Sequence, residues 1–243
     1  SEMCIRDSNI GGRTISIAID PTDTAVIWLG SASGGLWKSS TGGIGTGSWQ
    51  FVPTGFPVLG VGAISINPKN HDEIFIGTGE TYAYDVSTNG LIDRTQRGSF
   101  GIGILKSMDG GQNWTTSLDW TYQQNRGVWD IVHNPLNPAS LLAATTEGIY
   151  KSIDGGESWS QVLDRKMVMD LQLNKTDTNI VFAGVGNGDS SDKGIYKSND
   201  GGATWSLLTG NGLPNIYEHT GRITLAAVSY THLRAHETDS YLV

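Results

Sequence analysis

Aromatic and acidic side chains that suit a sugar ligand occur in several separate stretches of the sequence. They are Tyr82, Tyr84 and Asp85, then Trp120 and Tyr122, then Asp189, and then Tyr217. Aromatic rings stack on the apolar faces of sugars, and carboxylates accept hydrogen bonds from sugar hydroxyls. We expect these residues to bind a glycan or a protein if the fold brings them to one face. The alternative is that Trp129 and some of the tyrosines only pack the loops.

No catalytic residue can be assigned from the sequence. Hydrolysis of a glycosidic bond needs two carboxyl groups about 5 to 9.5 Å apart. The carboxylates without an evident structural role are Glu80, Asp85, Asp189 and Asp192. The sequence pairs none of them, so we expect no catalytic residue among them.

Neither a cofactor nor a bound metal ion is expected. Gly101-Ile102-Gly103 is too short for a dinucleotide fingerprint. The histidines lie on different loops without the spacing of metal ligands: His71, His133 and His219. The stretch Asp189-Ser190-Ser191-Asp192 has too few oxygen ligands for a calcium loop.

A nine-residue motif, called the repeat turn below, recurs along the chain. It occupies 106–114, 151–159 and 197–205, and its serines are 45 and 46 residues apart. The shared positions are a serine, an aspartate, a glycine and a tryptophan: Ser107, Asp109, Gly111 and Trp114; Ser152, Asp154, Gly156 and Trp159; Ser198, Asp200, Gly202 and Trp205. A degenerate copy runs from Lys38 to Gly43, with Trp49 displaced by a short insertion.

The residue types of the repeat turn predict a structural role. Paired glycines reach positive φ without a Cβ penalty, as a hairpin turn requires. The aspartate and serine can hydrogen-bond to the backbone inside the turn, and the tryptophan can cover it. We therefore expect these aspartates to be structural rather than catalytic, and the lysines at the start of each motif to be solvated.

Each repeat turn lies in a frame of short apolar runs bounded by Gly, Pro, Asn or Asp, which is the signature of strands. Four strands in about 45 residues predict an all-β fold, a β-propeller of four-stranded antiparallel blades. The blades are expected at about 12–52, 61–118, 127–163 and 168–210, with a fifth beginning at 221. Residues 9–227 then form a partial β-propeller of about four blades plus one strand.

The pattern Ser-X-Asp-Gly-Gly-X-X-Trp resembles the Asp-box, or BNR repeat, over roughly residues 11–227. That repeat occurs in sialidases, xyloglucanases, sortilin-type receptors, photosystem II assembly factors and many secreted bacterial proteins. The frame from Gly12 to Ser39 resembles the xyloglucanase and sortilin-like branch most. In xyloglucanase-like enzymes an aspartate precedes the Gly-Gly pair on the strand 2–3 loop of the first blade. Ala32 stands there in this sequence, which counts against catalysis.

Both ends of the chain depart from the repeat. Residues 1–8 and 228–243 resemble translated sequencing-adapter read-through, so we expect them to be non-native and exclude them from the fold argument. Cys4, the one cysteine, falls in the first of these segments. The resemblance implies that the intact propeller has further blades beyond those in this chain.

The net charge and the lengths of the apolar runs exclude further classes of function. The net charge of −8 argues against a nucleic-acid partner, which favours a basic face. No apolar run approaches the 18 residues of a membrane-spanning helix. The leading hypothesis is an exported, extracellular or cell-surface module that binds a glycan or a protein without catalysis. The alternatives are a fragment of a glycoside hydrolase and a sortilin-like or assembly-factor scaffold that binds a polypeptide.

The propeller fold predicts where the ligand binds. Strand 2–3 loops and connections between blades share one face, called the loop-rich face below, while the strand 1–2 turns and the repeat turns share the other. The largest insertion, 77–101, falls on the loop-rich face. Binding residues are expected there because function concentrates in loops on a rigid scaffold.

Overall fold

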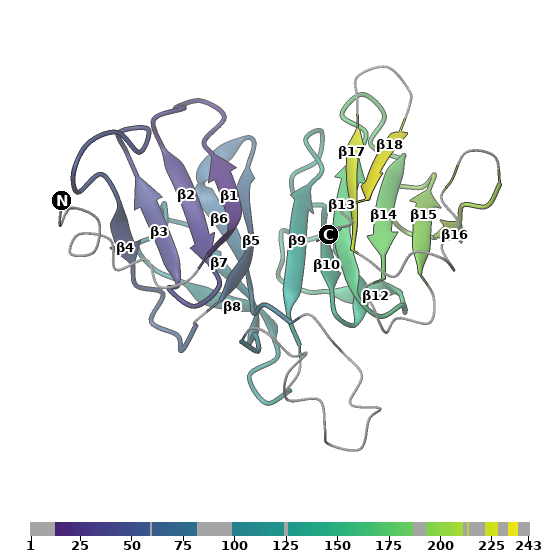
Figure 1. Ribbon diagram of the computed structural model, residues 1–243, viewed down its shortest axis with the longest axis horizontal. Helices are drawn as coiled ribbons and strands as arrows, with labels where there is room; N and C mark the ends of the chain where they lie inside the picture. The colour runs from purple at the N-terminus through teal and green to yellow at the C-terminus, as the bar shows by residue number, and fades with distance from the viewer. Residues whose placement is uncertain are drawn as a thin grey trace, which may run out of the picture.

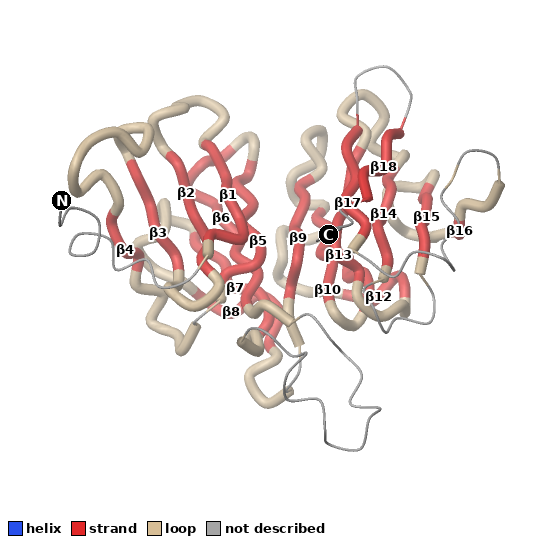
Figure 2. The backbone as a smooth tube through the Cα atoms, viewed as in Figure 1, coloured by secondary structure: helices blue, strands red, loops and turns tan. Residues whose placement is uncertain are grey.

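The computed structural model describes residues 13–58, 60–81, 99–123, 126–186, 193–210, 213, 222–227 and 233–237 of the 243-residue chain. Strands joined by loops and turns make up these residues (Figure 2). A search of the described part of the chain for a helix long and apolar enough to cross a membrane finds none.

Sixteen strands form four sheets of four strands each. The first sheet contains β1 (Thr14–Ile19), β2 (Ile27–Ser31), β3 (Leu36–Ser39) and β4 (Gln50–Val52). The second contains β5 (Val61–Asn67), β6 (Asn70–Thr78), β7 (Gly103–Ser107) and β8 (Thr115–Asp119). The third contains β9 (Val128–His133), β10 (Leu141–Thr145), β11 (Gly148–Ser152) and β12 (Ser160–Leu163). The fourth contains β13 (Val168–Leu173), β14 (Val181–Val185), β15 (Gly194–Ser198) and β16 (Ser206–Leu207).

Each sheet pairs its strands antiparallel in sequence order, so each is one up-and-down blade. In Figure 1 the first strands β5 and β9 lie in the middle of the view, and the fourth strands β4 and β16 lie at its two sides. The predicted fold class, an all-β propeller of four-stranded antiparallel blades, is confirmed.

A fifth, two-stranded sheet follows the fourth blade. It pairs β17 (Ile223–Ala227) with β18 (Leu233–Glu237). Strand β17 lies against β13 and β14 of the fourth blade, where the first strand of a fifth blade belongs. Strand β18 falls within residues 228–243. That this segment is non-native remains a prediction from the sequence.

The core consists of three layers, one between each pair of successive blades. We call the side of a blade that meets the preceding blade its front and the opposite side its back. In the layer between blades 3 and 4, Leu142 and Ile149 of the third blade pack against Leu171, Val181 and Ala183 of the fourth. Fully burying one such side chain stabilises the fold by about 1.5–3 kcal/mol, so the blades hold one another in place.

The repeat turn joins successive blades at their outer strands. Its second glycine approaches the preceding blade so closely that no Cβ fits. A Cβ on Gly111 would lie 2.5 Å from the Trp28 ring, and one on Gly156 would lie 2.5 Å from the Phe75 ring. Both glycines also have positive φ, 89° and 82°. Glycine is therefore required at this position for two independent reasons.

The lysines before the first two turns, Lys106 and Lys151, are not free in solvent, and this corrects the expectation from the sequence. Lys106 is only 9% exposed, and its Nζ donates to the Gly155 carbonyl of the next blade at 2.7 Å. The same bond joins Lys151 to Gly201 at 2.9 Å. These two lysines lie at blade interfaces because the partner carbonyl of each is about one repeat further along the chain.

The first strands are also joined to one another by polar side chains. Asp130 Oδ2 accepts the Leu171 N–H at 3.1 Å, and Asp170 Oδ2 accepts the Leu225 N–H at 2.6 Å. Ser16 Oγ donates to the Val61 carbonyl at 2.8 Å. These bonds satisfy backbone groups on the inner edge of each following blade, which would otherwise be left unpaired.

Candidate functional site

The aspartates of the repeat turns accept hydrogen bonds within their own turns. Asp109 Oδ1 accepts the N–H groups of Gln112 and Asn113 at 3.0 and 2.8 Å, and Ser107 Oγ donates to it at 2.9 Å. Bonds from the Asn113 backbone and side chain lower the pKa of Asp109 to about 2. The Asp109 carboxylate is therefore committed to the turn as an anion.

The other two turns repeat this geometry. Bonds from Ser158 lower the pKa of Asp154 to about 2, and bonds from Thr204 lower the pKa of Asp200 still further. The indole N–H groups of Trp114 and Trp205 donate to glycine carbonyls of their own turns, while that of Trp159 donates to Ser117 Oγ at 2.9 Å.

Only two of the expected ligand-binding residues fall within the described part of the chain, and they differ in how much of each side chain is exposed. Trp120 is 3% exposed, which corrects the expectation of an accessible ring. It packs in the layer between blades 2 and 3, with an edge contact to Tyr150 at 5.6 Å. Tyr122, two residues later in the connection from β8 to β9, is 95% exposed. The remaining expected residues lie outside the described residues: Tyr82, Tyr84, Asp85, Asp189 and Tyr217.

A group of charged residues, called the Glu147 cluster, lies beside Trp120 on the loop-rich face. It consists of Arg126, Glu147 and Lys166. Glu147 occupies the short turn between β10 and β11 and is 5% exposed. Lys166 Nζ lies 2.6 Å from its Oε2, and Arg126 Nε lies 3.7 Å from its Oε1. The Arg126 guanidinium also lies over the Trp120 ring, 5.2 Å from its centre, so the buried ring interacts favourably with the partly buried cation.

A second buried carboxylate lies on the same face. Glu80 follows β6 and is 1% exposed, and its carboxylate pairs with the Arg13 guanidinium at the start of β1. In the equivalent loop of the first blade, Ala32 is 8% exposed and its N–H donates to the Arg13 carbonyl at 2.9 Å. The two buried carboxylates of this face, Glu80 and Glu147, thus lie beside cations, and the first-blade position has no carboxylate.

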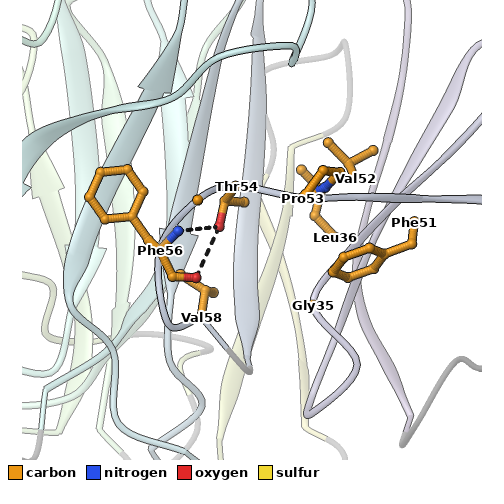
Figure 3. A pocket seen from close by; sticks show the side chains of 9 residues that line it. Gly35, Leu36, Phe51, Val52, Pro53, Thr54, Phe56 and Val58 are labelled. Atoms are coloured by element: carbon orange, nitrogen blue, oxygen red, sulfur yellow. Dashed lines mark hydrogen bonds between the residues drawn. The ribbon is translucent and has the colours of Figure 1, made fainter.

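A small cavity of about 180 Å³ lies between β4 and the connection to the second blade. Figure 3 shows Phe51 beside Gly35 at one side of this cavity and Thr54 hydrogen-bonded to Phe56 at the other. Pockets for drug-sized ligands measure about 300–1,000 Å³. The cavity can therefore take one small apolar group, while an extended ligand would lie across the surface.

The inner first strands hold a pair of carboxyl groups with raised pKa values. Burial, and then the charge of Asp170, raise the pKa of Asp130 to about 7. Burial also raises the pKa of Asp170. Shifted carboxyl groups are candidates for acid–base chemistry. Here each carboxyl group is used to hold the next first strand, which is a structural role.

Two of the three histidines expected in loops lie in strands instead. His71 lies in β6 and His133 in β9 rather than in loops. His71 Nδ1 lies 3.0 Å from Asp20 Oδ1. His133 bonds to Ser65 Oγ at 2.8 Å, and burial lowers its pKa to about 4. His219 lies outside the described residues.

No family model matches the sequence, and no curated protein matches it either. Solved structures do match. An ancestral GH74 enzyme matches with 20% identity and a TM-score of 0.66, over 88% of this chain and 27% of that one. The GH74 xyloglucanase from Xanthomonas campestris matches with 15% identity and a TM-score of 0.57, over 84% of this chain and 31% of that one. The extracellular domain of a hybrid two-component system from B. thetaiotaomicron matches with 13% identity and a TM-score of 0.57, over 87% of this chain and 24% of that one.

These likenesses show the fold. The chain spans less than a third of the length of each of these three proteins. The geometry of the site is therefore the basis for inferring its function.

Sequence reasoning missed the Glu147 cluster and the Arg13–Glu80 pair. Their members are far apart in the chain and do not belong to the repeated motif. One signal was available, because Glu80 and Glu147 both lie in strand 2–3 loops and outside the repeated motif that explains the repeat-turn aspartates.

Proposed function

We propose that this chain is part of an exported Asp-box β-propeller that binds a glycan on its loop-rich face without catalysis. The observation that carries the proposal is Tyr122, a ring 95% exposed in the same connection as Trp120 and Arg126. An exposed ring beside charged side chains offers both contacts that a sugar needs, stacking and hydrogen bonds.

The non-catalytic part of the proposal is supported by the carboxylates. Glu80 and Glu147 lie beside Arg13 and Lys166, respectively. Neither is placed as one of two free carboxyl groups flanking a glycosidic bond. Ala32 at the first-blade position adds to this argument, because the resemblance to xyloglucanase-like enzymes implies an aspartate there.

An extracellular or cell-surface location fits the proposal. The structural relatives include the extracellular domain of a two-component system, and the Asp-box resemblance points to secreted bacterial proteins. The further blades implied by the resemblance belong to the same proposal, since a propeller closes its ring to remove open faces.

The binding test compares Tyr122→Ala with a matched control, Ile153→Ala. Ile153 is also a large exposed side chain, 74% exposed, but it lies in a repeat turn on the opposite face. The ligand is a set of xyloglucan oligosaccharides, and affinity is measured by isothermal titration calorimetry. An aromatic contact is worth about 0.5–1.5 kcal/mol beyond its buried area. We therefore expect Tyr122→Ala to weaken binding about three- to tenfold and Ile153→Ala to leave it unchanged. Equal affinities for both variants would rule out this face.

The second candidate is a glycoside hydrolase fragment, favoured by the likeness to GH74 enzymes. In that case the catalytic carboxyl groups come from residues outside the described part or from further blades. Asp85 and Asp189 are the residues to replace. Turnover of xyloglucan by the longer protein that is abolished by Asp85→Ala or Asp189→Ala would establish this alternative.

A further inference from the structure

Each blade carries a receptor for the repeat turn of the next blade, formed by two side chains on its back. We call this pair the lysine socket. It consists of an apolar side chain on the second strand and the lysine directly opposite it on the third strand. The four pairs are Trp28 with Lys38, Phe75 with Lys106, Leu142 with Lys151, and Phe182 with Lys197.

The first three sockets are filled in the same way. The lysine Nζ donates to the carbonyl of the first turn glycine of the next blade, at 3.5, 2.7 and 2.9 Å from the first socket to the third. The apolar side chain lies where a Cβ on the second turn glycine would be, so it packs against the bare glycine backbone. Recognition therefore needs an apolar surface, an ammonium group, and a Gly-Gly turn with positive φ.

The fourth socket holds no repeat turn among the described residues. The Lys197 ammonium lies 5.8 Å from the centre of the Phe182 ring and makes no hydrogen bond to another described residue. Both side chains are partly exposed. The same pair in the second blade, Phe75 and Lys106, is at most 9% exposed because a turn covers it.

The inner part of the same surface is already covered by a strand. Leu225 of β17 is 3% exposed, and its N–H is held by Asp170, as the Leu171 N–H is held by Asp130. A fifth blade has therefore begun at its first strand. Residues 222–243 contain no glycine, so they cannot supply the Gly-Gly turn that the socket fits.

We propose that Phe182 and Lys197 form a docking site for the repeat turn of a fifth blade, supplied as a hairpin of its third and fourth strands. The occupant is a polypeptide hairpin with the pattern Ser-X-Asp-Gly-Gly-X-X-Trp. Its first turn glycine accepts a hydrogen bond from Lys197, and its second lies flat on the Phe182 ring. This site is separate from the proposed glycan-binding face, because the repeat turns lie on the opposite face.

The probe is a synthetic hairpin with the sequence of residues 194–208, closed by a disulfide between added terminal cysteines. Its hairpin conformation is first verified by NMR, and its affinity for the full chain is then measured by fluorescence anisotropy. A control hairpin has alanine in place of both turn glycines. We expect the first hairpin to bind and the control hairpin not to bind, because alanine disfavours positive φ and its Cβ would meet the Phe182 ring.

Variants of the full chain locate the bound hairpin. Lys197→Met removes the ammonium but keeps the aliphatic stem, and should weaken binding at least about tenfold, as expected for a hydrogen bond from a charged group. Lys38→Met makes the same change in a filled socket and should alter the affinity less than about twofold. Phe182→Leu should retain binding, since Leu142 fills this role in the third blade, and Phe182→Asp should abolish it. Thermal unfolding confirms that each variant is folded.

Three results would overturn the proposal. One is no binding of the hairpin, and another is binding that Lys197→Met leaves unchanged. The third is self-association of the chain in analytical ultracentrifugation that Lys197→Met abolishes, which would assign the surface to a second copy instead. Binding that depends on Lys197 and on both glycines, by a chain that sediments as a monomer, supports it.

Discussion

Two aspartates of this molecule have pKa values shifted in opposite directions, and their surroundings explain the difference. Asp154 is exposed and receives hydrogen bonds from Ser158, which stabilise the anion. Desolvation of the Asp130 carboxyl group, and then the charge of Asp170, disfavour its anion. The two aspartates therefore make the stability of the protein depend on pH in opposite directions.

Replacing Asp130 tests the inner carboxyl group. Its pKa is raised to about 7 in the folded protein, so stability is lost as pH rises from about 4 through 7. Asp130→Asn removes this titration but keeps an oxygen to accept the Leu171 N–H. We expect the melting temperature of Asp130→Asn to exceed that of the wild type by several degrees at pH 8, with the gap shrinking toward pH 4. A gap that does not change with pH would contradict the assignment. His133, whose pKa is lowered to about 4, acts in the opposite direction but is present in both proteins.

Replacing Asp154 tests the repeat turn. Its pKa is lowered to about 2, so its contribution is present above about pH 4 and is lost as pH falls through 2. Asp154→Ala should lower the melting temperature by a few degrees at pH 7 and by progressively less in acid. Differential scanning calorimetry between pH 2 and 7 measures this, with Asp177→Ala, an aspartate outside the repeat turns, as the comparison. A deficit that persists unchanged at pH 2 would show that the charge is not responsible.

For single residues, the sequence indicated which side chains could bind a ligand but not which of them are accessible. Trp120 and Tyr122 lie two residues apart and were expected to be equivalent, yet one is buried and the other exposed. The difference depends on Arg126 and Tyr150, which contact the Trp120 ring. Burial of this kind is set by contacts between blades, which no local pattern encodes.

At the scale of elements, equivalent strands of successive blades form the same packing interface. One position on the front of the first strand is buried in three successive sheets, at Ile131, Leu171 and Leu225, each at most 3% exposed. In the first blade the same position is Ile17, 63% exposed. A row of side chains runs across that front face from Ile17 through Leu29 and Trp37 to Phe51. No described residue covers Ile17 as a preceding blade would.

The contrast between these positions predicts different costs for the same truncation. Leu171→Ala creates a cavity in the layer between blades 3 and 4 and should cost about 2–5 kcal/mol of unfolding free energy. Ile17→Ala removes a side chain that is mostly in water and should cost less than about 1 kcal/mol. Urea unfolding measures both values. Similar costs would mean that Ile17 is covered in solution.

The lysines that precede the repeat turns give a second comparison between elements. Lys106 donates to Gly155 and also lies 3.1 Å from Glu157 and 3.4 Å from Glu73. Lys106→Met should therefore cost about 1.5–3 kcal/mol, the value of hydrogen bonds to charged groups. Lys197→Met should cost less than about 0.5 kcal/mol, because no described residue fills its socket. Equal losses in thermal unfolding would contradict the distinction between filled and empty sockets.

The pattern of strands could be read from the sequence because each blade repeats its own apolar runs and turn residues. The partners of the lysines could not, because each partner carbonyl lies 49 or 50 residues away in the next blade. The same holds for the Glu147 cluster, which joins residues from two connections and one turn. Repetition reveals a blade, while contacts between blades appear only in three dimensions.

At the scale of the whole molecule, the chain is an arc of blades with two unlike ends and one loop-rich face. The front of the first blade exposes apolar side chains, and the back of the fourth carries a lysine socket that no described residue fills. These two surfaces are suited to further blades, whereas the loop-rich face carries Tyr122 and the charged residues suited to a ligand. The two proposals therefore place assembly and ligand binding on different surfaces.

The most direct test of the proposed function measures binding and hydrolysis in one sample. Xyloglucan oligosaccharides are titrated into the chain by calorimetry, and new reducing ends are then counted in the same solution. The proposal predicts saturable binding that Tyr122→Ala weakens, with no reducing ends above the buffer control. Accumulating reducing ends, or binding unaffected by Tyr122→Ala, would contradict it.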